Sequence, residues 1–274
     1  MLTLPILTLA LLAASSAAAP PPGVPHAAHV TIVMMENRNY ASIVGNPSAP
    51  YFNHTLVAEG MLLRNYHAIA HPSEPNYLAL FSGSTQGVTG DDCPVEFGAR
   101  NLATELAAAG LAFAGYAESM PRDGYRGCVG SGGLYGRKHV PWADFADVSP
   151  EQNRVYRGFP ADPPAVLWIT PNMCDDMHDC STRTGDRWLA AHLPQIVAWD
   201  AKHDGWLVVT WDEADPDPDA SNRVPAVIVG PMVAQGASDR RADHYALLRT
   251  IEENFRLPCI ARECSAAPIA GIWR

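Results

Sequence analysis

Two short apolar segments from opposite ends of the chain each run directly into acidic or amide side chains. Residues 30–35 are followed by Glu36 and Asn37, and residues 206–210 by Trp211 and then Asp212 and Glu213. Both segments have the composition of buried strands, and ligands of parallel sheets bind beyond the carboxyl ends of the strands. Gathered carboxylates without basic partners repel one another, and a hard divalent cation relieves that repulsion. The sequence therefore predicts a metal site, with water-exposed acids at strand ends as the alternative.

Ser73 is a second residue that could take part in a reaction. It lies between Pro72 and Pro75, directly ahead of a helical pattern over residues 76–81. The start of a helix carries partial positive charge, which favours a phosphate or an oxyanion. A rigidly held hydroxyl in such a place is suited to nucleophilic attack, whereas the simpler interpretation is a plain helix cap.

The elements that must position these side chains follow an alternating pattern. Strands are predicted at 30–35, 111–117, 166–170, 206–210 and 224–229, and helices at 102–109, 188–197 and 245–255. This alternation predicts an α/β fold with a mainly parallel central sheet and helices on both faces. The Gly- and Pro-rich segment 124–164 is expected to run over the sheet without joining the core. No repeat or flexible linker divides the chain, so residues 20–274 are predicted to form one domain.

The first 19 residues have the pattern of a secretory signal peptide. An apolar run of about 13 residues ends in small residues, and it is shorter than the roughly 20 residues of a membrane span. No Lys or Arg precedes the run, and Pro20 disfavours cleavage directly after Ala19. A retained membrane anchor is the alternative. The pattern favours a secreted or periplasmic protein without a stable membrane span.

The six cysteines agree with export. Cys174 lies close to Cys180 and Cys259 close to Cys264, and such spacing in an exported chain is typical of disulfides. This pairing leaves Cys93 with Cys128, although spacing alone does not fix the connectivity. Asp175, Asp176 and Asp179, inside the first of these loops, are either turn-capping residues or cation ligands.

Charge narrows the possible partners. The 274 residues carry 29 Asp plus Glu against 19 Lys plus Arg, a net charge of -10. A surface of this charge repels a phosphate backbone, which argues against nucleic acid as the main partner. An anionic substrate therefore has to meet a local cation, either a metal ion or a small group of basic side chains.

Several motifs occur together in one order along residues 29–272. They are MENRNY at 35–40, HPSEPNY at 71–77, YAESMP at 116–121, RKHVPW at 137–142, PNMCDDMHDCS at 171–181, TWDE at 210–213 and HYALLRTIE at 244–252. In these motifs the chain resembles the bacterial phosphoesterase family of acid phosphatases and phosphocholine-type phospholipases C. That family belongs to the alkaline phosphatase-like superfamily.

The resemblance implies roles for particular residues. The metal-binding positions of the family match Glu36, Asn37, Ser73, Asp212 and Glu213, and they imply one or more divalent metal ions whose identity the sequence does not give. Ser73 also matches the nucleophile, so a phosphoserine intermediate is expected. The basic residues around the phosphate are matched by Lys138, His139 and His178, and one imidazolium among them is a candidate acid for the leaving alcohol. The resemblance includes His244, for which a structural role is the alternative.

Departures from the family pattern bear on the substrate. A Gly-rich segment with an Asp-His pair soon after the acidic pair, frequent in phospholipase members, is absent from this sequence. Hydrolysis of small phosphomonoesters is therefore the leading prediction, and phospholipase C-type cleavage at a phospholipid headgroup is the runner-up. An exported cation-binding module without catalysis is the distant alternative.

Overall fold

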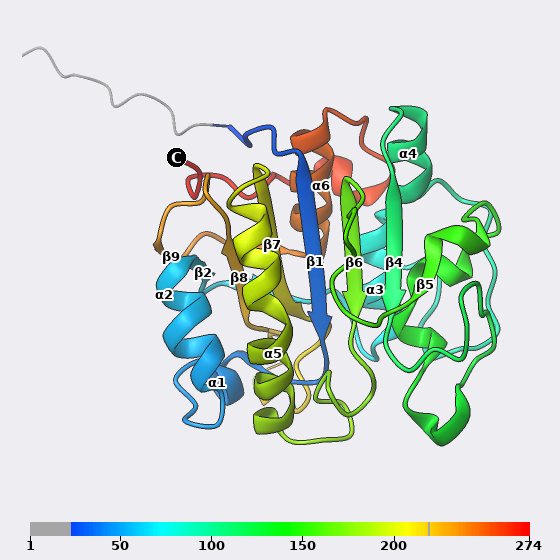
Figure 1. Cartoon of the computed structure of the whole chain (residues 1–274), viewed down its shortest axis with the longest axis horizontal. Coiled ribbons are helices and arrows are strands. Elements are labelled where there is room, and N and C mark those ends of the chain that lie inside the picture. The colour runs from blue at the N-terminus through cyan, green and yellow to red at the C-terminus, as the bar shows by residue number, and fades with distance from the viewer. Residues whose placement is uncertain (1–22, 219) are drawn as a thin grey trace, which may run out of the picture.

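The computed structural model describes residues 23–218 and 220–274, so the predicted signal peptide lies outside the described residues. Its centre is a sheet in the order β5-β4-β6-β1-β7-β8-β2-β9, drawn in Figure 1. The strands are β1 (His29–Met35), β2 (Met61–Leu63), β4 (Phe113–Ala117), β5 (Asn153–Val155), β6 (Val166–Thr170), β7 (Gly205–Trp211), β8 (Ala226–Val229) and β9 (Gly236–Ser238). All neighbours pair in parallel except β8, which is antiparallel to β7 and to β2. The predicted mainly parallel α/β fold is confirmed.

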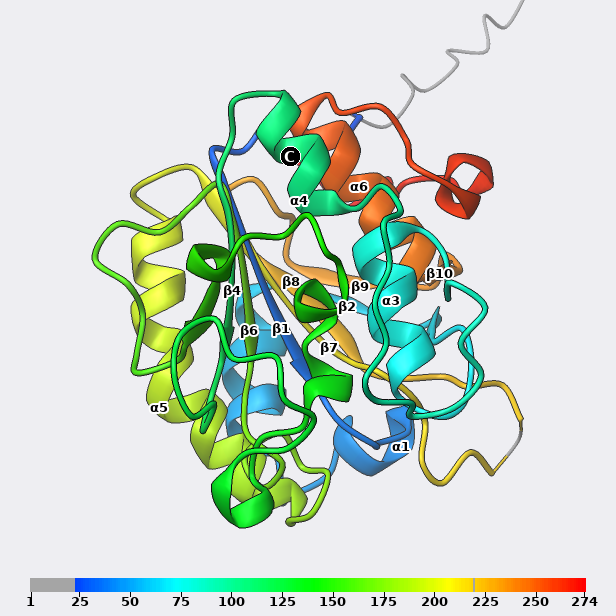
Figure 2. The ribbon, with the colours of Figure 1, turned by 90° about the vertical axis from the view of Figure 1, so that its right-hand side faces the viewer.

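Helices cover both faces of this sheet. They are α1 (Tyr40–Ile43), a π-helical turn (Phe52–Leu56), α2 (Val57–Glu59), α3 (Glu74–Ser82), α4 (Leu102–Ala108), α5 (Thr182–Asp200) and α6 (His244–Phe255). Figure 2 shows α5 on one side of the sheet and α3, α4 and α6 on the other. A separate parallel pair, β3 (Tyr66–His67) with β10 (Ala242–Asp243), joins the segment before α3 to the start of α6.

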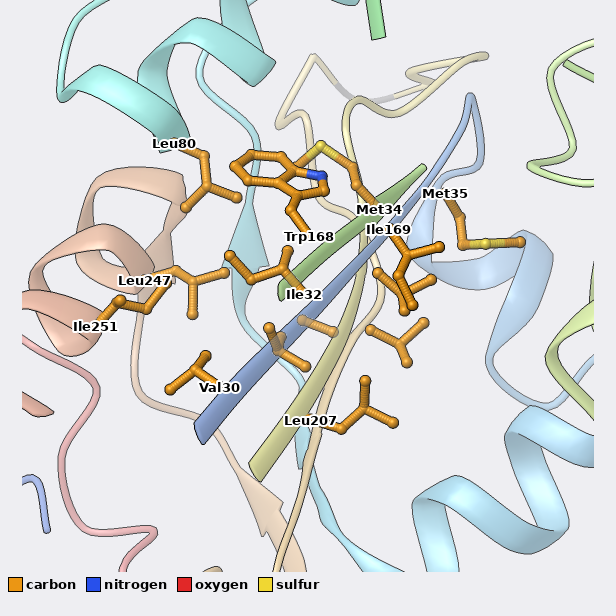
Figure 3. Close-up of a cluster of buried hydrophobic side chains, with 14 of the residues drawn as sticks. Val30, Ile32, Met34, Met35, Leu80, Trp168, Ile169, Leu207, Leu247 and Ile251 are labelled. Carbon is orange, nitrogen blue, oxygen red and sulfur yellow. The ribbon is translucent and has the colours of Figure 1, made fainter. Parts of the chain in front are cut away.

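The strand β1 is buried on both faces. Figure 3 shows Val30 and Ile32 facing Leu247 and Ile251 of α6, while Met35 lies on the other side of the strand. Their side chains are fully or almost fully buried, as expected for a central strand of a parallel sheet. This packing fixes the carboxyl end of β1, where the chemistry is expected.

The predicted elements are present with shifted ends. Asn101 caps α4 through a reciprocal hydrogen-bond pair with Thr104, and α6 begins one residue earlier than predicted, at His244. The short strands β2, β3, β9 and β10 carry too few residues for a period to be visible, and the sequence did not reveal them. Each becomes a strand only because a segment distant in the chain offers hydrogen-bonding partners.

The expectation for segment 124–164 was wrong in part. Its residues Trp142 and Phe145 are completely buried, and its strand β5 pairs with β4 at the edge of the sheet. Trp142 lies against Gly115 of β4, where a Cβ atom would stand 2.1 Å from Trp142 Cε2. The Gly and Pro content therefore reflects tight turns between core-contributing pieces, and a bare glycine provides the space for the indole ring.

Three disulfides cross-link the loops. They join Cys93 to Cys128, Cys174 to Cys180 and Cys259 to Cys264, which confirms the expected pairing. Among residues 23–218 and 220–274, no helix has both the length and the hydropathy needed to cross a membrane.

Candidate active site

The sheet brings the two acidic pairs together. Met35 of β1 is aligned with Trp211 of β7, so the next residues, Glu36 and Asp212, emerge side by side at the carboxyl ends of parallel strands. Figure 1 shows the arrowheads of β1, β4 and β6 at this edge. The backbone N–H of Asn37 donates to Asp212 Oδ1 over 3.0 Å, and Asn37 adopts a φ of 51°, which Asn tolerates better than most residues. Glu36 and Asp212 are completely buried.

Ser73 reaches the same point from α3. Its hydroxyl lies 3.1 Å from Glu36 Oε2 and 3.1 Å from Glu213 Oε1, and it can donate its proton to either. The Ser73 side chain makes no capping hydrogen bond to α3, which rejects the plain-cap alternative. A buried serine hydroxyl held between two carboxylates is placed to lose its proton.

The carboxylates of this cluster have raised pKa values. Burial, and then the charges of Asp212 and Asp176, raise the pKa of Glu36 well above its usual range. Burial, followed by the charge of Glu213, raises the pKa of Asp212 to about 7. Burial also raises the pKa of Glu213. The folded protein therefore holds several carboxyl groups in surroundings that disfavour their charge.

Two unpartnered oxygens of the cluster indicate which kind of ion these residues could bind. Asn37 Oδ1 and Asp212 Oδ2 are buried and have no hydrogen-bond partner among the described residues. An unpartnered amide oxygen, carboxylate oxygens and a hydroxyl make a hard donor set, the kind that divalent cations such as Mg²⁺, Mn²⁺ or Ca²⁺ prefer. The five residues predicted as metal ligands thus lie together, and their chemistry fits a divalent ion.

His139 faces the acids from the opposite side. It ends a 3₁₀ turn (Arg137–His139), and its Nε2 lies 3.1 Å from Glu36 Oε1 while its Nδ1 lies 3.4 Å from Asp176 Oδ2. Burial, and then the charges of Lys138 and His178, lower the pKa of His139 well below its usual range. A neutral imidazole is therefore favoured at this position.

Lys138 and His178 form the outer part of this basic group. Lys138 Nζ lies 2.7 Å from Asp91 Oδ2 and 3.2 Å from His178 Nε2, and His178 Nδ1 lies 2.7 Å from Asp179 Oδ1. Since an ammonium group only donates, His178 Nε2 accepts and Nδ1 carries the proton. Burial lowers the pKa of Lys138, but the hydrogen bond and charge of Asp91 outweigh it, and the pKa is raised.

The three predicted basic residues therefore gather beside the acids. Candidate ligand atoms of Glu36, His139 and His178 lie within 4.8 Å of one another. A cation at His178 Nε2 would have to displace the ammonium of Lys138.

Two contributors escaped the sequence analysis. Tyr77 donates its hydroxyl to Glu36 Oε1 and stacks on His139, with ring centroids 5.2 Å apart. Its position four residues after Ser73, one turn along the same helix, was the available signal. Asp91 carried no signal at all, because its contact with Lys138 spans 47 positions. Asp176 was left undecided between two roles.

Asp176 and His244 lie close behind the ligands. Asp176 is completely buried, its Oδ1 accepts from the backbone of His178, and its carbonyl accepts from Glu36 N over 2.8 Å. His244 is also buried and lies between the Asp212 carbonyl at 2.8 Å and the hydroxyl of Tyr66 at 3.0 Å. The turn-capping role of Asp176 and the structural role of His244 are thus both realised.

A protein-family model also matches this chain. The model described as the phosphoesterase family matches residues 46–258. The chain belongs to the phosphoesterase family. It is a hydrolase that acts on phosphoric ester bonds.

Relatives of this phosphoesterase carry phosphatase names. It is 43% identical over 255 residues to a phosphatidylinositol-3-phosphatase of Mycobacterium tuberculosis, a match covering 91% of this chain and 84% of the relative. It is 30% identical over 231 residues to a phosphate-repressible acid phosphatase of Penicillium chrysogenum, with 77% of this chain and 56% of the relative covered. The phosphoesterase thus matches little more than half the length of this fungal relative.

Solved structures share the fold of the phosphoesterase. A protein of the alkaline phosphatase superfamily from Vibrio parahaemolyticus aligns with a TM-score of 0.59 at 14% identity, over 86% of this chain and 68% of that chain. The C-terminal periplasmic domain of EcEptC from Escherichia coli, solved in complex with zinc, aligns with a TM-score of 0.53 at 10% identity, over 88% and 87%. At these identities the likeness establishes the fold alone.

Proposed function

We propose that this phosphoesterase hydrolyses phosphomonoesters in a metal-dependent reaction with Ser73 as the nucleophile. The observation that carries the proposal is the position of Ser73 Oγ, 3.1 Å from a carboxylate oxygen of both Glu36 and Glu213. The divalent ion would be held by Glu36, Asn37, Ser73, Asp212 and Glu213. When bound, such an ion lowers the pKa of a coordinated hydroxyl and offsets negative charge on the transferring phosphoryl group.

The side chains perform the proton transfers of the first step. The Ser73 proton moves to Glu213 or Glu36, and Ser73 Oγ forms a bond to phosphorus while the bond to the leaving oxygen breaks. His178 is assigned as the acid that protonates this oxygen: as an imidazolium it gives its Nε2 proton to the leaving oxygen once Lys138 has turned to the phosphate, and it regains a proton from water. A water molecule then cleaves the phosphoserine, which releases phosphate and restores the hydroxyl.

The basic group binds the phosphate oxygens in this scheme. Lys138 is charged and only partly buried, so it can turn from Asp91 to an incoming phosphate. Neutral His139 would donate one ring N–H, and stacking on Tyr77 holds the ring. An acidic protein thereby presents the positive charge of Lys138 to an anionic substrate.

Two observations bear on the substrate. The names of the bacterial and fungal relatives describe phosphomonoester hydrolysis, which keeps phosphomonoesters ahead of phospholipase C-type diesters. The identity of 43% to a phosphatidylinositol-3-phosphatase makes a phosphorylated inositol lipid headgroup the second candidate substrate.

Export and domain organisation complete the proposal. Residues 1–19 are proposed as a cleaved signal peptide and residues 20–274 as one phosphoesterase domain in a secreted or periplasmic protein. Three disulfides support an oxidising compartment, and neighbouring strands β1 and β7, which come from distant parts of the chain, support a single unit.

Ser73→Ala tests the nucleophile. The variant is expected to lose at least about a thousandfold in kcat on 4-nitrophenyl phosphate while still binding inorganic phosphate. Ser82→Ala, a buried serine on the same helix, is the control and should keep its activity. Acid quench of the wild type followed by peptide mass analysis should place phosphate on Ser73. Substantial activity in Ser73→Ala, with no phosphopeptide in the wild type, would point to water as the nucleophile.

Chelation tests the metal dependence, and alternative substrates test the preference for phosphomonoesters. Dialysis against a chelator should abolish activity, and the added divalent ion that restores it identifies the metal. Bis(4-nitrophenyl) phosphate and phosphatidylcholine serve as diester substrates beside the monoester. Faster turnover of a diester would favour the phospholipase C alternative.

A further inference from the structure

A small pocket adjoins the proposed active site. It has a volume of about 80 Å³ and is lined by Asn39, Tyr40, Ala41, Asp217, Pro218 and Arg223. A chain of contacts links it to the nucleophile: Ser73 bonds to Glu213, Glu213 contacts His71 Nδ1, and His71 Nε2 lies 3.3 Å from Asp217 Oδ2. The pocket therefore lies at the rim of the site.

Asp217, which lines this pocket, has one carboxylate oxygen without a hydrogen-bond partner in the part of the chain that the structure describes. Its Oδ2 accepts from the backbone of Asn222 over 2.9 Å and is also the atom that faces His71. Its Oδ1 is buried and has no hydrogen-bond partner among the described residues. A buried acceptor in this state is stabilised when a ligand brings a donor.

Arg223 brings hydrogen-bond donors held in a fixed plane. Its Nε donates to the carbonyl of Arg64 over 2.7 Å, and its guanidinium lies 3.8 Å from the centroid of the Tyr40 ring. Within residues 23–218 and 220–274 the structure records no ion pair for Arg223, although Asp217 lines the same pocket. The carboxylate and the guanidinium thus face one space without neutralising each other.

The chemistry of the two groups selects the ligand. A simple anion would be repelled by Asp217 and a simple cation by Arg223, whereas a hydroxyl group can donate to the first and accept from the second. We propose that this pocket binds hydroxyl groups of a polyol leaving group, so that phosphorylated sugars or inositols are the preferred substrates. The volume is too small for an acyl chain. This inference rests on the proposed phosphomonoesterase function.

The test compares two phosphomonoesters that differ in the leaving group. For wild type, Asp217→Asn and Arg223→Gln, kcat/KM is measured on myo-inositol 1-phosphate and on 4-nitrophenyl phosphate. Each variant is expected to lower the inositol-to-aryl ratio of kcat/KM about tenfold, the loss of one hydrogen bond to a ligand. The exposed residues in Asp162→Asn and Arg241→Gln are controls in which the ratio should not change.

Two further arms complete the design. Phosphatidylinositol 3-phosphate in micelles replaces the soluble substrate to separate a lipid headgroup from a free polyol phosphate, and the same fall in ratio is expected. A fall with the lipid alone would overturn the polyol assignment. So would an unchanged ratio in both variants, while phosphomonoesterase activity itself would stand. If wild type hydrolyses neither ester, saturation-transfer NMR with free inositol decides: binding that Asp217→Asn abolishes supports the pocket, and absence of binding overturns it.

Discussion

Asp186 of α5 and Asp212 after β7 are both buried aspartates, yet their surroundings differ. Asp186 is 2% exposed, and its two oxygens accept from the backbone N–H groups of Tyr51 and Phe52 over 3.0 and 2.9 Å. Asp212 is 0% exposed, and only its Oδ1 has a partner, Asn37 N. Both oxygens of Asp186 therefore have hydrogen-bond donors from the fold, whereas among the described residues only one oxygen of Asp212 has a donor.

Under the proposed function, the difference separates a structural acid from a functional one. Asp186 fixes the start of a helical segment, and backbone donors compensate for its burial. Asp212 stands with Glu36 and Asp176 in a cluster whose mutual repulsion the fold does not relieve. Burying such a group lowers stability, and the divalent ion of the proposed function would offset this cost.

Asp212→Asn should produce the largest effect. Loss of a ligand is expected to lower kcat/KM at least about a thousandfold and to reduce bound metal, measured by elemental analysis. The melting temperature of the metal-free protein should stay the same or rise, because the substitution removes a repelling buried charge. Unchanged metal content with full activity would reject the metal assignment and end the contrast with Asp186.

Asp186→Ala should show the reverse pattern. Two buried N–H groups would lose their acceptor, which costs about 2–4 kcal/mol of unfolding free energy and lowers the melting temperature by about 5–15 °C. Because Asp186 lies outside the cluster, kcat on 4-nitrophenyl phosphate well below melting should change less than about twofold. Urea unfolding of the variant and the wild type measures the first quantity. A variant as stable as the wild type would contradict the structural role.

Asp200 sharpens the comparison, because it is unpartnered and solitary. Neither of its oxygens has a hydrogen-bond partner among the described residues, and burial raises its pKa to about 7. A carboxyl whose folded pKa exceeds its unfolded value favours folding at low pH, and stability falls as pH rises from about 4 to 7. Asp200→Asn is therefore expected to raise the melting temperature relative to wild type at pH 8 more than at pH 4, with kcat unchanged. A pH-independent difference would contradict the assignment.

Tyr77→Phe should have the smallest effect. The hydroxyl that fixes Glu36 Oε1 would be lost while the ring stays stacked on His139, and metal affinity is expected to fall about tenfold. Isothermal titration of the metal-free protein measures this affinity independently of turnover. Tyr135→Phe is a matched control, because the Tyr135 hydroxyl is buried and has no hydrogen-bond partner among the described residues. Equal affinities in the two variants would show that Tyr77 only fills space.

Features that depend on neighbouring residues could be predicted from the sequence. The continuous apolar run before Glu36 predicted a buried strand, and the pattern over residues 102–109 predicted a helix, since both signals lie within a few positions. The ordered motifs placed the chain in its family, and the close pairs of cysteines predicted two of the disulfides. In each case the residues that carry the signal are close together in the chain, so the pattern can be recognised in the sequence.

Contacts between groups that are distant in the chain could not be predicted and are visible only in the folded structure. The contacts of Lys138 with Asp91, of Tyr77 with Glu36 and of Asp217 with His71 join positions that are 41 to 146 residues apart. The unpartnered oxygens of Asp212 and Asp217 exist only because the folded chain excludes water from them without supplying a donor. Burial and pairing are properties of the assembled sheet and loops, and a list of residue types does not contain them.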